Sequence, residues 1–170
     1  MTAYRRWRVA GASYFFTVVL ADRGSDALLR HIEVLRAAFA LVMRERPFHI
    51  DAAVILPDHL HCIWTLPEGD SDYPERWRRI KVAFSRGIPD LVPPSASRTK
   101  KGERGVWQRR YWEHLLRDED DWRHHVDYIH LNPVKHGLVT RPQDWLYSSY
   151  LRYVANGFYP QGWMEYENDV

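Results

Sequence analysis

Two histidines, His59 and His61, alternate with apolar residues over positions 59–66. This alternation predicts a β-strand, from one face of which both imidazoles project about 6.5–7 Å apart. At that separation both rings can bind one divalent ion through bonds of about 2.1 Å. Two hydrogen-bonded histidines on a half-exposed strand would have the same spacing, so the motif alone leaves both interpretations open.

A second candidate group lies in residues 118–131, which have a helical pattern with acidic residues in the first turn. Tyr128 and Asn132 are four residues apart and would face the same point, where the phenol can attack and the amide can bind a cation. Tyr128 could equally be a core tyrosine, and Asn132 could end the helix because Pro133 disfavours helical geometry in the residue before it. Three further polar residues of this segment are expected to point elsewhere: His124, Asp127 and His130.

Periodicity also predicts the elements that position these residues. Strands are expected at residues 13–20, 48–56, 59–66 and 106–116, and helices over residues 28–42, 73–86 and 118–131. Residues 88–105 are rich in Pro and Ser and are expected to form a loop. The order of strands and helices favours an α+β fold, with a ferredoxin-like antiparallel sheet and helices packed on it.

Composition sets further bounds. A chain of 170 residues with 45% hydrophobic and 27% charged residues fits one globular domain over residues 1–170. The longest apolar stretch, residues 14–21, is too short to span a membrane, and no signal-peptide pattern precedes it, so we expect a cytoplasmic protein. The single cysteine, Cys62, excludes an internal disulfide and leaves histidines, carboxylates and amides as possible metal ligands.

Basic residues are concentrated between positions 73 and 111. The chain has a net charge of +2, whereas this segment has eleven basic and three acidic residues. Such a segment predicts either a surface that neutralises DNA phosphates or an ordinary solvated face. Most aromatic residues are expected in the core, but four lie among these arginines and could stack on unpaired bases: Trp77, Trp107, Tyr111 and Trp112. The candidate DNA-binding residues are Arg78, Arg79, Lys100, Lys101, Arg109 and Arg110.

Four segments together carry a family resemblance. They are residues 58–64 (DHLHCIW), 106–114 (VWQRRYWEH), 128–139 (YIHLNPVKHGLV) and 144–150 (DWLYSSY). In this order they resemble the REP-associated tyrosine transposases, which are single-tyrosine members of the HUH endonuclease superfamily. Motifs in a fixed order are far more specific than any one of them, and the likeness extends over nearly the whole chain.

The resemblance implies the roles of the candidate residues. His59 and His61 would be paired ligands of Mg²⁺ or Mn²⁺, Tyr128 the nucleophile, and Asn132 the third ligand, a position that is Gln in other branches. The implied activity is cutting and rejoining of single-stranded or hairpin DNA, such as repetitive extragenic palindromes, through a 5′-phosphotyrosine intermediate. The chain could act as a monomer or a homodimer. Two alternatives remain: a module that binds DNA hairpins without cutting, and a metal-dependent hydrolase with a water nucleophile.

Overall fold

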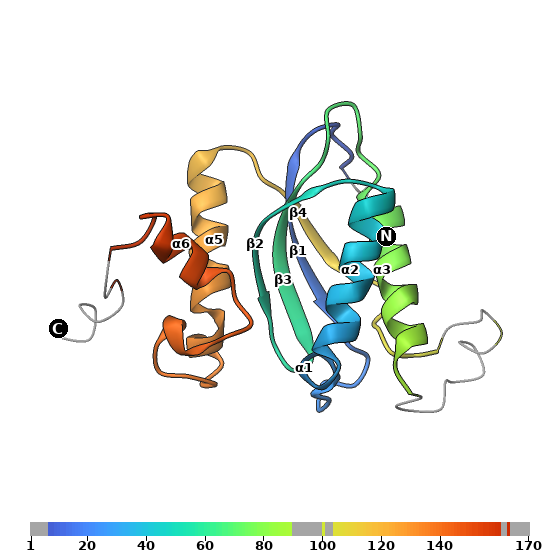
Figure 1. The fold of residues 1–170 in the computed structure, drawn as a ribbon. Helices are drawn as coiled ribbons and strands as arrows, with labels where there is room; N and C mark the ends of the chain where they lie inside the picture. The colour runs from blue at the N-terminus through green and yellow to red at the C-terminus, as the bar shows by residue number, and fades with distance from the viewer. Residues whose placement is uncertain (1–6, 90–99, 101–103, 161–162, 164–170) are drawn as a thin grey trace, which may run out of the picture.

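A four-stranded antiparallel sheet organises the protein. The computed structural model describes residues 7–89, 100, 104–160 and 163. Within these ranges the strand order is β2-β3-β1-β4 (Figure 1). The strands are β1 (Ser13–Val19), β2 (His49–Ile55), β3 (His59–Thr65) and β4 (Trp112–Leu115). This order, with all neighbours antiparallel, confirms the predicted ferredoxin-like α+β fold.

Helices cover both faces of the sheet. They are α1 (Ala27–Arg30), α2 (Ile32–Glu45), α3 (Tyr73–Gly87), α5 (Glu119–Lys135) and α6 (Tyr150–Ala155), with a 3₁₀ turn at Pro142–Asp144. Figure 1 shows α2 and α3 on one face and α5 on the other. None of the helices in the described ranges is long and apolar enough to cross a membrane.

Because β3 is central and covered on both faces, almost all of its residues are buried. Successive side chains alternate between the faces, so Leu60, Cys62 and Trp64 join the core beneath α2 and α3. His59 and His61 therefore point to the α5 side. The strand predicted from alternation thus has both its apolar and its polar face buried.

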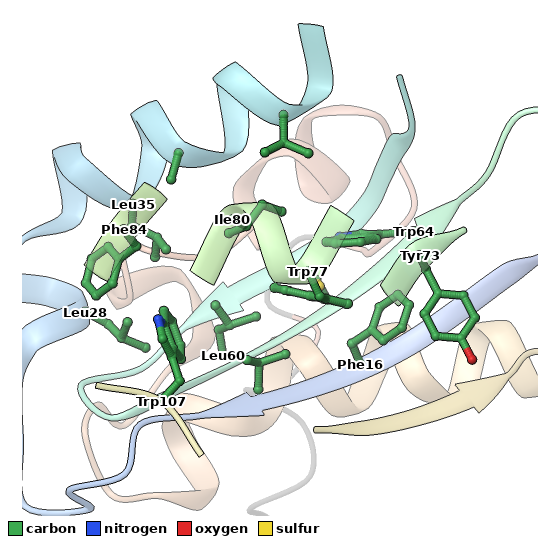
Figure 2. Packing of buried hydrophobic residues seen from close by; sticks show 14 of the residues in the cluster. Phe16, Leu28, Leu35, Leu60, Trp64, Tyr73, Trp77, Ile80, Phe84 and Trp107 are labelled. Carbon is green, nitrogen blue, oxygen red and sulfur yellow. The ribbon is translucent and has the colours of Figure 1, made fainter. Parts of the chain in front are cut away.

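Aromatic side chains dominate the core beneath α2 and α3 (Figure 2). Trp64 of β3 stacks on Trp77 of α3 with ring centroids 4.2 Å apart, and Phe16 of β1 meets both rings. Burying a large apolar side chain such as Phe16 stabilises the fold by about 1.5–3 kcal/mol. Because this layer packs on one face of β1 and β3, it holds both strands in place. It thereby also determines where the side chains on their other face lie.

Two predicted elements differ from the structure. The helix expected over residues 28–42 is divided at His31 into α1 and α2, and α1 is anchored because the Leu28 N–H donates to the Pro57 carbonyl at 3.2 Å. The strand expected at 106–116 forms a ladder only in β4, with one isolated bridge between Trp107 and Leu20. The Trp107 side chain is buried against α3, which draws this part of the chain away from regular pairing. Most of the loop expected at 88–105 lies outside the described residues.

Helix α5 continues beyond its predicted end. Pro133 lies inside it, and its fixed φ is compatible with helical geometry although it lacks an N–H donor. The helix ends instead at Lys135, and two residues later Gly137 has a φ of +67°, the left-handed conformation that suits glycine. The N–H groups of Gly137 and Leu138 donate to carbonyls of the last turn at 2.9 and 3.0 Å, which is a Schellman cap. Asn132 is therefore an interior helical residue.

Candidate metal centre and nucleophile

The two predicted histidines lie side by side on β3, facing α5. Their ring centroids are 5.0 Å apart. The Nδ1 atom of His59 is hydrogen-bonded to the Asp58 carboxylate at 2.7 Å, and the Nδ1 atom of His61 to the Thr17 hydroxyl at 2.8 Å. Because these partners hold Nδ1 in each ring, Nε2 is the nitrogen left to bind a ligand. Neither Asp58 nor Thr17 was singled out from the sequence, although Asp58 directly precedes His59.

Two buried polar atoms at this place have no hydrogen-bond partner among the described residues: His61 Nε2 and Asn132 Oδ1. Leaving such an atom unpaired costs about 1–3 kcal/mol. Both can donate a lone pair to a cation, as the imidazoles and amides of metal sites do. Within the described residues His31 Nε2 and the indole nitrogen of Trp77 also lack a partner, but His31 lies at the junction of α1 and α2, and the indole nitrogen is only a donor and cannot bind a metal ion.

One stripe of α5 faces the histidine pair. Tyr128, Asn132 and His136 follow one another at four-residue intervals and so share a side of the helix. The ring of Tyr128 lies 5.2 Å from that of His61, and the ring of His136 lies 5.1 Å from that of His59. Asn132 lies between these two residues along the helix, on the same side by its four-residue spacing, and is buried.

The structure therefore brings together the four residues predicted to form the site: His59, His61, Tyr128 and Asn132. It also adds His136, whose signal in the sequence was the next step of the same four-residue spacing. His136 is exposed and adds a third imidazole at the edge of the site.

Burial keeps both strand histidines neutral. It lowers the pKa of His61 to about 3, with the nearby His59 and His136 adding to the shift. Burial also lowers the pKa of His59, although the Asp58 carboxylate opposes it. Burial tends to raise the pKa of Asp58, but hydrogen bonds from His59 and Arg23 outweigh it and the pKa is lowered. Two neutral imidazoles beside one carboxylate suit a divalent cation, since only unprotonated nitrogen can bind it.

The ring of Tyr128 is held on three sides. It is half-buried and packs edge-on against Phe15 and His61, at centroid distances of 5.8 and 5.2 Å. The ammonium of Lys135 lies 5.1 Å from the ring centroid, a distance at which a cation is attracted to an aromatic face. These contacts orient the phenol ring at the edge of the histidine pair.

A second histidine cluster lies on the same face of the sheet, where β4 meets the first turns of α5. Its possible ligand atoms, from His114, Asp121 and His125, lie within 4.8 Å of one another. Here the polar groups already bind one another: the Asp121 carboxylate accepts from His114 Nε2 at 2.9 Å and from Arg117, and His125 Nδ1 donates to the Asp121 carbonyl. Burial acts to raise the pKa of Asp121, yet these hydrogen bonds lower it to about 2. The arginine beside Asp121 disfavours a cation here.

Three polar residues of α5 that were expected to point away from the candidate site do so: His124, Asp127 and His130. His130 is fully buried and hydrogen-bonded to Tyr159 and Ser149, at 2.9 and 2.7 Å. Asp127 accepts a hydrogen bond from the same Tyr159 hydroxyl. His124 is exposed. His130 and Asp127 thus bind the C-terminal segment of the protein rather than the site.

The structure divides the candidate DNA-binding residues into two sets. Arg78 and Arg79 lie on α3, on the face of the sheet opposite Tyr128, and both pair with Glu75 at 2.6–2.8 Å. Arg79 also pairs with Glu45. Hydrogen bonds from the two arginines lower the pKa of Glu75 to about 2. These arginines are therefore engaged in ion pairs on the helical layer behind the sheet.

Two of the remaining candidates, Arg109 and Arg110, are exposed and lie just before the edge strand β4 in the chain. Lys100 is also exposed. Lys101 lies outside the described residues. Arg76, which contributes to the basic charge of the segment, is buried and bonded to the Asp70 carboxylate at 2.7 Å, so it is a structural residue.

An apolar cleft of about 370 Å³ lies elsewhere, between α2, β2 and residues 146–149. Its lining includes Phe39, Met43 and Leu146 and contains none of the predicted site residues. The cleft is on the opposite side of the sheet from Tyr128, so the chemistry is not expected there.

A histidine pair on the central strand of a ferredoxin-like sheet, facing a tyrosine on a helix, is consistent with the resemblance of the sequence to the single-tyrosine transposases. Over 163 residues the chain is 47% identical to the REP-associated tyrosine transposase of Escherichia coli (strain K12), covering 96% of this chain and 91% of that protein. A relative from Haemophilus influenzae, named for the same family, is 44% identical over 164 residues, covering 96% of this chain and 93% of the relative.

A solved structure of a REP-associated tyrosine transposase bound to a REP hairpin superposes with a TM-score of 0.82 at 46% sequence identity, covering 100% of this chain and 95% of the other. No protein-family model matches the chain. At this identity and coverage, the chain belongs to the REP-associated tyrosine transposases, and it is an enzyme.

Proposed function

We propose that the protein cuts and rejoins single-stranded or hairpin DNA through a 5′-phosphotyrosine at Tyr128. The observation that carries the proposal is a pair of buried atoms, His61 Nε2 and Asn132 Oδ1, that have no hydrogen-bond partner among the described residues, with the Tyr128 ring 5.2 Å from the ring of His61. The substrate class is supported by the related transposase that is bound to a REP hairpin.

The proposed cofactor is Mg²⁺ or Mn²⁺, held by His59, His61 and Asn132. The two neutral imidazoles and the amide oxygen are ligands of the right kind, and two of the three donor atoms lack any other partner among the described residues. When bound, the cation would polarise the scissile phosphate and offset the negative charge that develops during in-line attack.

The nucleophile is the Tyr128 phenol oxygen. It forms a bond to the phosphorus while the bond from phosphorus to the 3′ oxygen breaks, so the fragment that keeps the 5′-phosphate becomes attached to the protein and the other fragment leaves with a 3′-hydroxyl. The phenol loses its proton to solvent and the departing 3′ oxygen gains one. One phosphodiester replaces another, so a 3′-hydroxyl can reverse the step and join strands without ATP.

The neighbouring residues prepare these groups. Asp58 and Thr17 orient the two imidazoles, as partners behind a metal ligand commonly do. Phe15 and Lys135 orient the Tyr128 ring. Arg109, Arg110, Lys100 and Lys101 are proposed to contact DNA phosphates. Arg78 and Arg79, proposed for the same role, would have to exchange their glutamate partners for phosphates.

The test is formation of a covalent adduct. A hairpin oligonucleotide with single-stranded flanks and Mn²⁺ is expected to give a protein–DNA species that survives denaturing electrophoresis. Tyr128→Phe should abolish it, because the ring packing is kept and only the attacking oxygen is lost. Tyr147→Phe is the matched control, since Tyr147 is also half-buried but lies at the apolar cleft.

Other outcomes would reject parts of the proposal. An adduct that persists in Tyr128→Phe would show that another residue is the nucleophile. Cleavage without an adduct would support a hydrolase with a water nucleophile. Binding of the hairpin without cutting under either cation would support a module that only binds DNA.

A further inference from the structure

Tertiary structure separates the four aromatic residues that lie among the arginines. Trp77 is fully buried and Trp107 is 7% exposed. Tyr111 is half-buried and packs on Phe16 and Trp77. Trp112 is 58% exposed, so it is the one member of the group whose ring surface is open to a ligand.

Strand register places Trp112 on the face that carries the site. Thr17 of β1 pairs with His61 on one side and with Trp112 on the other. Residues directly opposite one another in a sheet share a face, and the Thr17 hydroxyl already bonds the His61 ring there. Neighbouring strands are about 4.8 Å apart, so the backbone of Trp112 lies roughly 10 Å from that of His61.

This part of the face is open. Helix α5 packs mainly on β2 and β3, and β4 is the edge strand of the sheet as far as the structure describes it. Arg109 and Arg110, both exposed, come three and two residues before Trp112 in the chain and bring positive charge to the same edge. An exposed indole near arginines, on the face of the sheet that carries His61 and Tyr128, has the chemistry of a surface that binds a single nucleic-acid strand.

We propose that Trp112 is a stacking platform for an unpaired base of a nucleotide near the phosphate that Tyr128 attacks. This inference rests on the proposed function and names the residue that holds the single strand in place. Stacking requires a base with a free face, so the platform selects single-stranded over duplex DNA beside the cut and does not read sequence.

Binding in EDTA tests the inference without cleavage. A hairpin with single-stranded extensions is compared with the same hairpin lacking them, for the wild-type protein and for Trp112→Ala. We expect Trp112→Ala to weaken binding of the extended hairpin roughly 5- to 150-fold, the range for loss of one stacked base, and to leave the hairpin without extensions unaffected. Trp112→Phe should restore most of the affinity.

Trp7→Ala is the matched control. Trp7 is 74% exposed, but its carbonyl accepts from Tyr73 on the α3 side of the sheet, away from Tyr128. An abasic site moved along the extension should weaken wild-type binding at one position and have no further effect in Trp112→Ala, because both changes remove the same contact.

Several results would overturn the inference: an unchanged affinity of Trp112→Ala, an equal loss on both hairpins, an equal loss in Trp7→Ala, or additive effects of the abasic site and the substitution. Any of these, with adduct formation intact, rejects the stacking role and leaves the proposed function standing. Failure of the wild-type protein to bind either hairpin or to form an adduct rejects the proposed function itself.

Discussion

Two histidine clusters lie on the same face of one sheet and differ in whether their polar atoms are paired. Where β4 meets α5, His114 and Asp121 bond each other and Arg117 adds further hydrogen bonds to the same carboxylate. Where β3 meets the middle of α5, His61 and Asn132 each bury an atom that finds no partner within the described ranges.

This difference separates a structural cluster from a ligand site better than residue type does. The first cluster has the composition of a metal site, with two histidines and a carboxylate, but its internal hydrogen bonds already satisfy that carboxylate. The second cluster includes the amide of Asn132, which in a sequence is a weaker sign of a metal site than a carboxylate is. Yet this cluster holds the two buried acceptor atoms that have no partner among the described residues. An unpaired buried acceptor costs about 1–3 kcal/mol, and a bound cation would remove that cost.

Removing one histidine from each cluster is the strongest test of which cluster binds the metal ion. We expect His61→Ala to slow Mn²⁺-dependent adduct formation by about a hundred- to a thousandfold, because a metal supplies several kcal/mol of charge stabilisation in the transition state. His114→Ala should reduce the rate only a few-fold. Both are measured by adduct formation on the same hairpin.

Heat denaturation with and without Mn²⁺ provides the control for misfolding. His114→Ala should still gain stability from Mn²⁺, and His61→Ala should not, since only a bound ligand stabilises the folded state. The opposite result would assign the metal to the cluster at β4 and make the unpaired atoms irrelevant.

A smaller change tests the hydrogen bond that orients the proposed metal ligand His61. Thr17→Val keeps the shape of the side chain but removes the hydroxyl that bonds His61 Nδ1 at 2.8 Å. Loss of such a partner is expected to weaken Mn²⁺ binding about 10- to 100-fold, with adduct formation recovering at high Mn²⁺. Titration of the adduct rate with Mn²⁺ measures it.

Thr65→Val is the matched control for this substitution. Thr65 lies on the same face of β3 as His61 but bonds Asp51 and Ser13, at 2.7 and 2.6 Å. An equal shift in the Mn²⁺ requirement of both variants would mean that the threonines act through general stability and that Thr17 has no special role.

The smallest effect concerns pH. Burial lowers the pKa of both His61 and His130 to about 3, although only His130 is fully hydrogen-bonded. Between pH 6.5 and 3 the unfolded chain binds the extra proton, so the free energy of unfolding falls as pH falls, by about 1.4 kcal/mol per pH unit for each histidine. Urea unfolding in EDTA from pH 7 to 5 should show a shallower dependence in His130→Gln.

This measurement tests whether burial alone, without a metal, keeps a histidine such as His130 neutral. A pH dependence of His130→Gln equal to that of the wild-type protein would mean that His130 titrates near its ordinary pKa, and the assignment of burial as the cause would be wrong.

Local periodicity predicted much of the fold and the residues of the candidate site that lie close together in the structure. Alternation along residues 59–66 placed both histidines on one face of a strand, and the four-residue interval placed Tyr128 and Asn132 on one stripe of a helix. These patterns are reliable because the geometry of an isolated strand or helix fixes them. Pro133 was the misleading signal: it suggested a helix end, whereas the Schellman cap at Gly137 sets that end.

Contacts between distant segments could not be predicted in this way. The pairing of Arg78 and Arg79 with glutamates, and the burial of Trp107 beside the exposed Trp112, depend on which helix packs on which face. A run of mixed basic and aromatic residues carries no record of that packing, because neighbours in sequence are divided between opposite faces of the sheet.

The sequence by itself determined which residues could do chemistry and on which side of their own element they lie, because those properties follow from residue type and from the period of a strand or helix. Only the tertiary structure decided that β3 and α5 face each other, that His136 lies beside His59, and that His61 Nε2 and Asn132 Oδ1 are buried with no hydrogen-bond partner in the described part of the chain. Those properties arise where elements far apart in the chain exclude water together, and no local pattern encodes them.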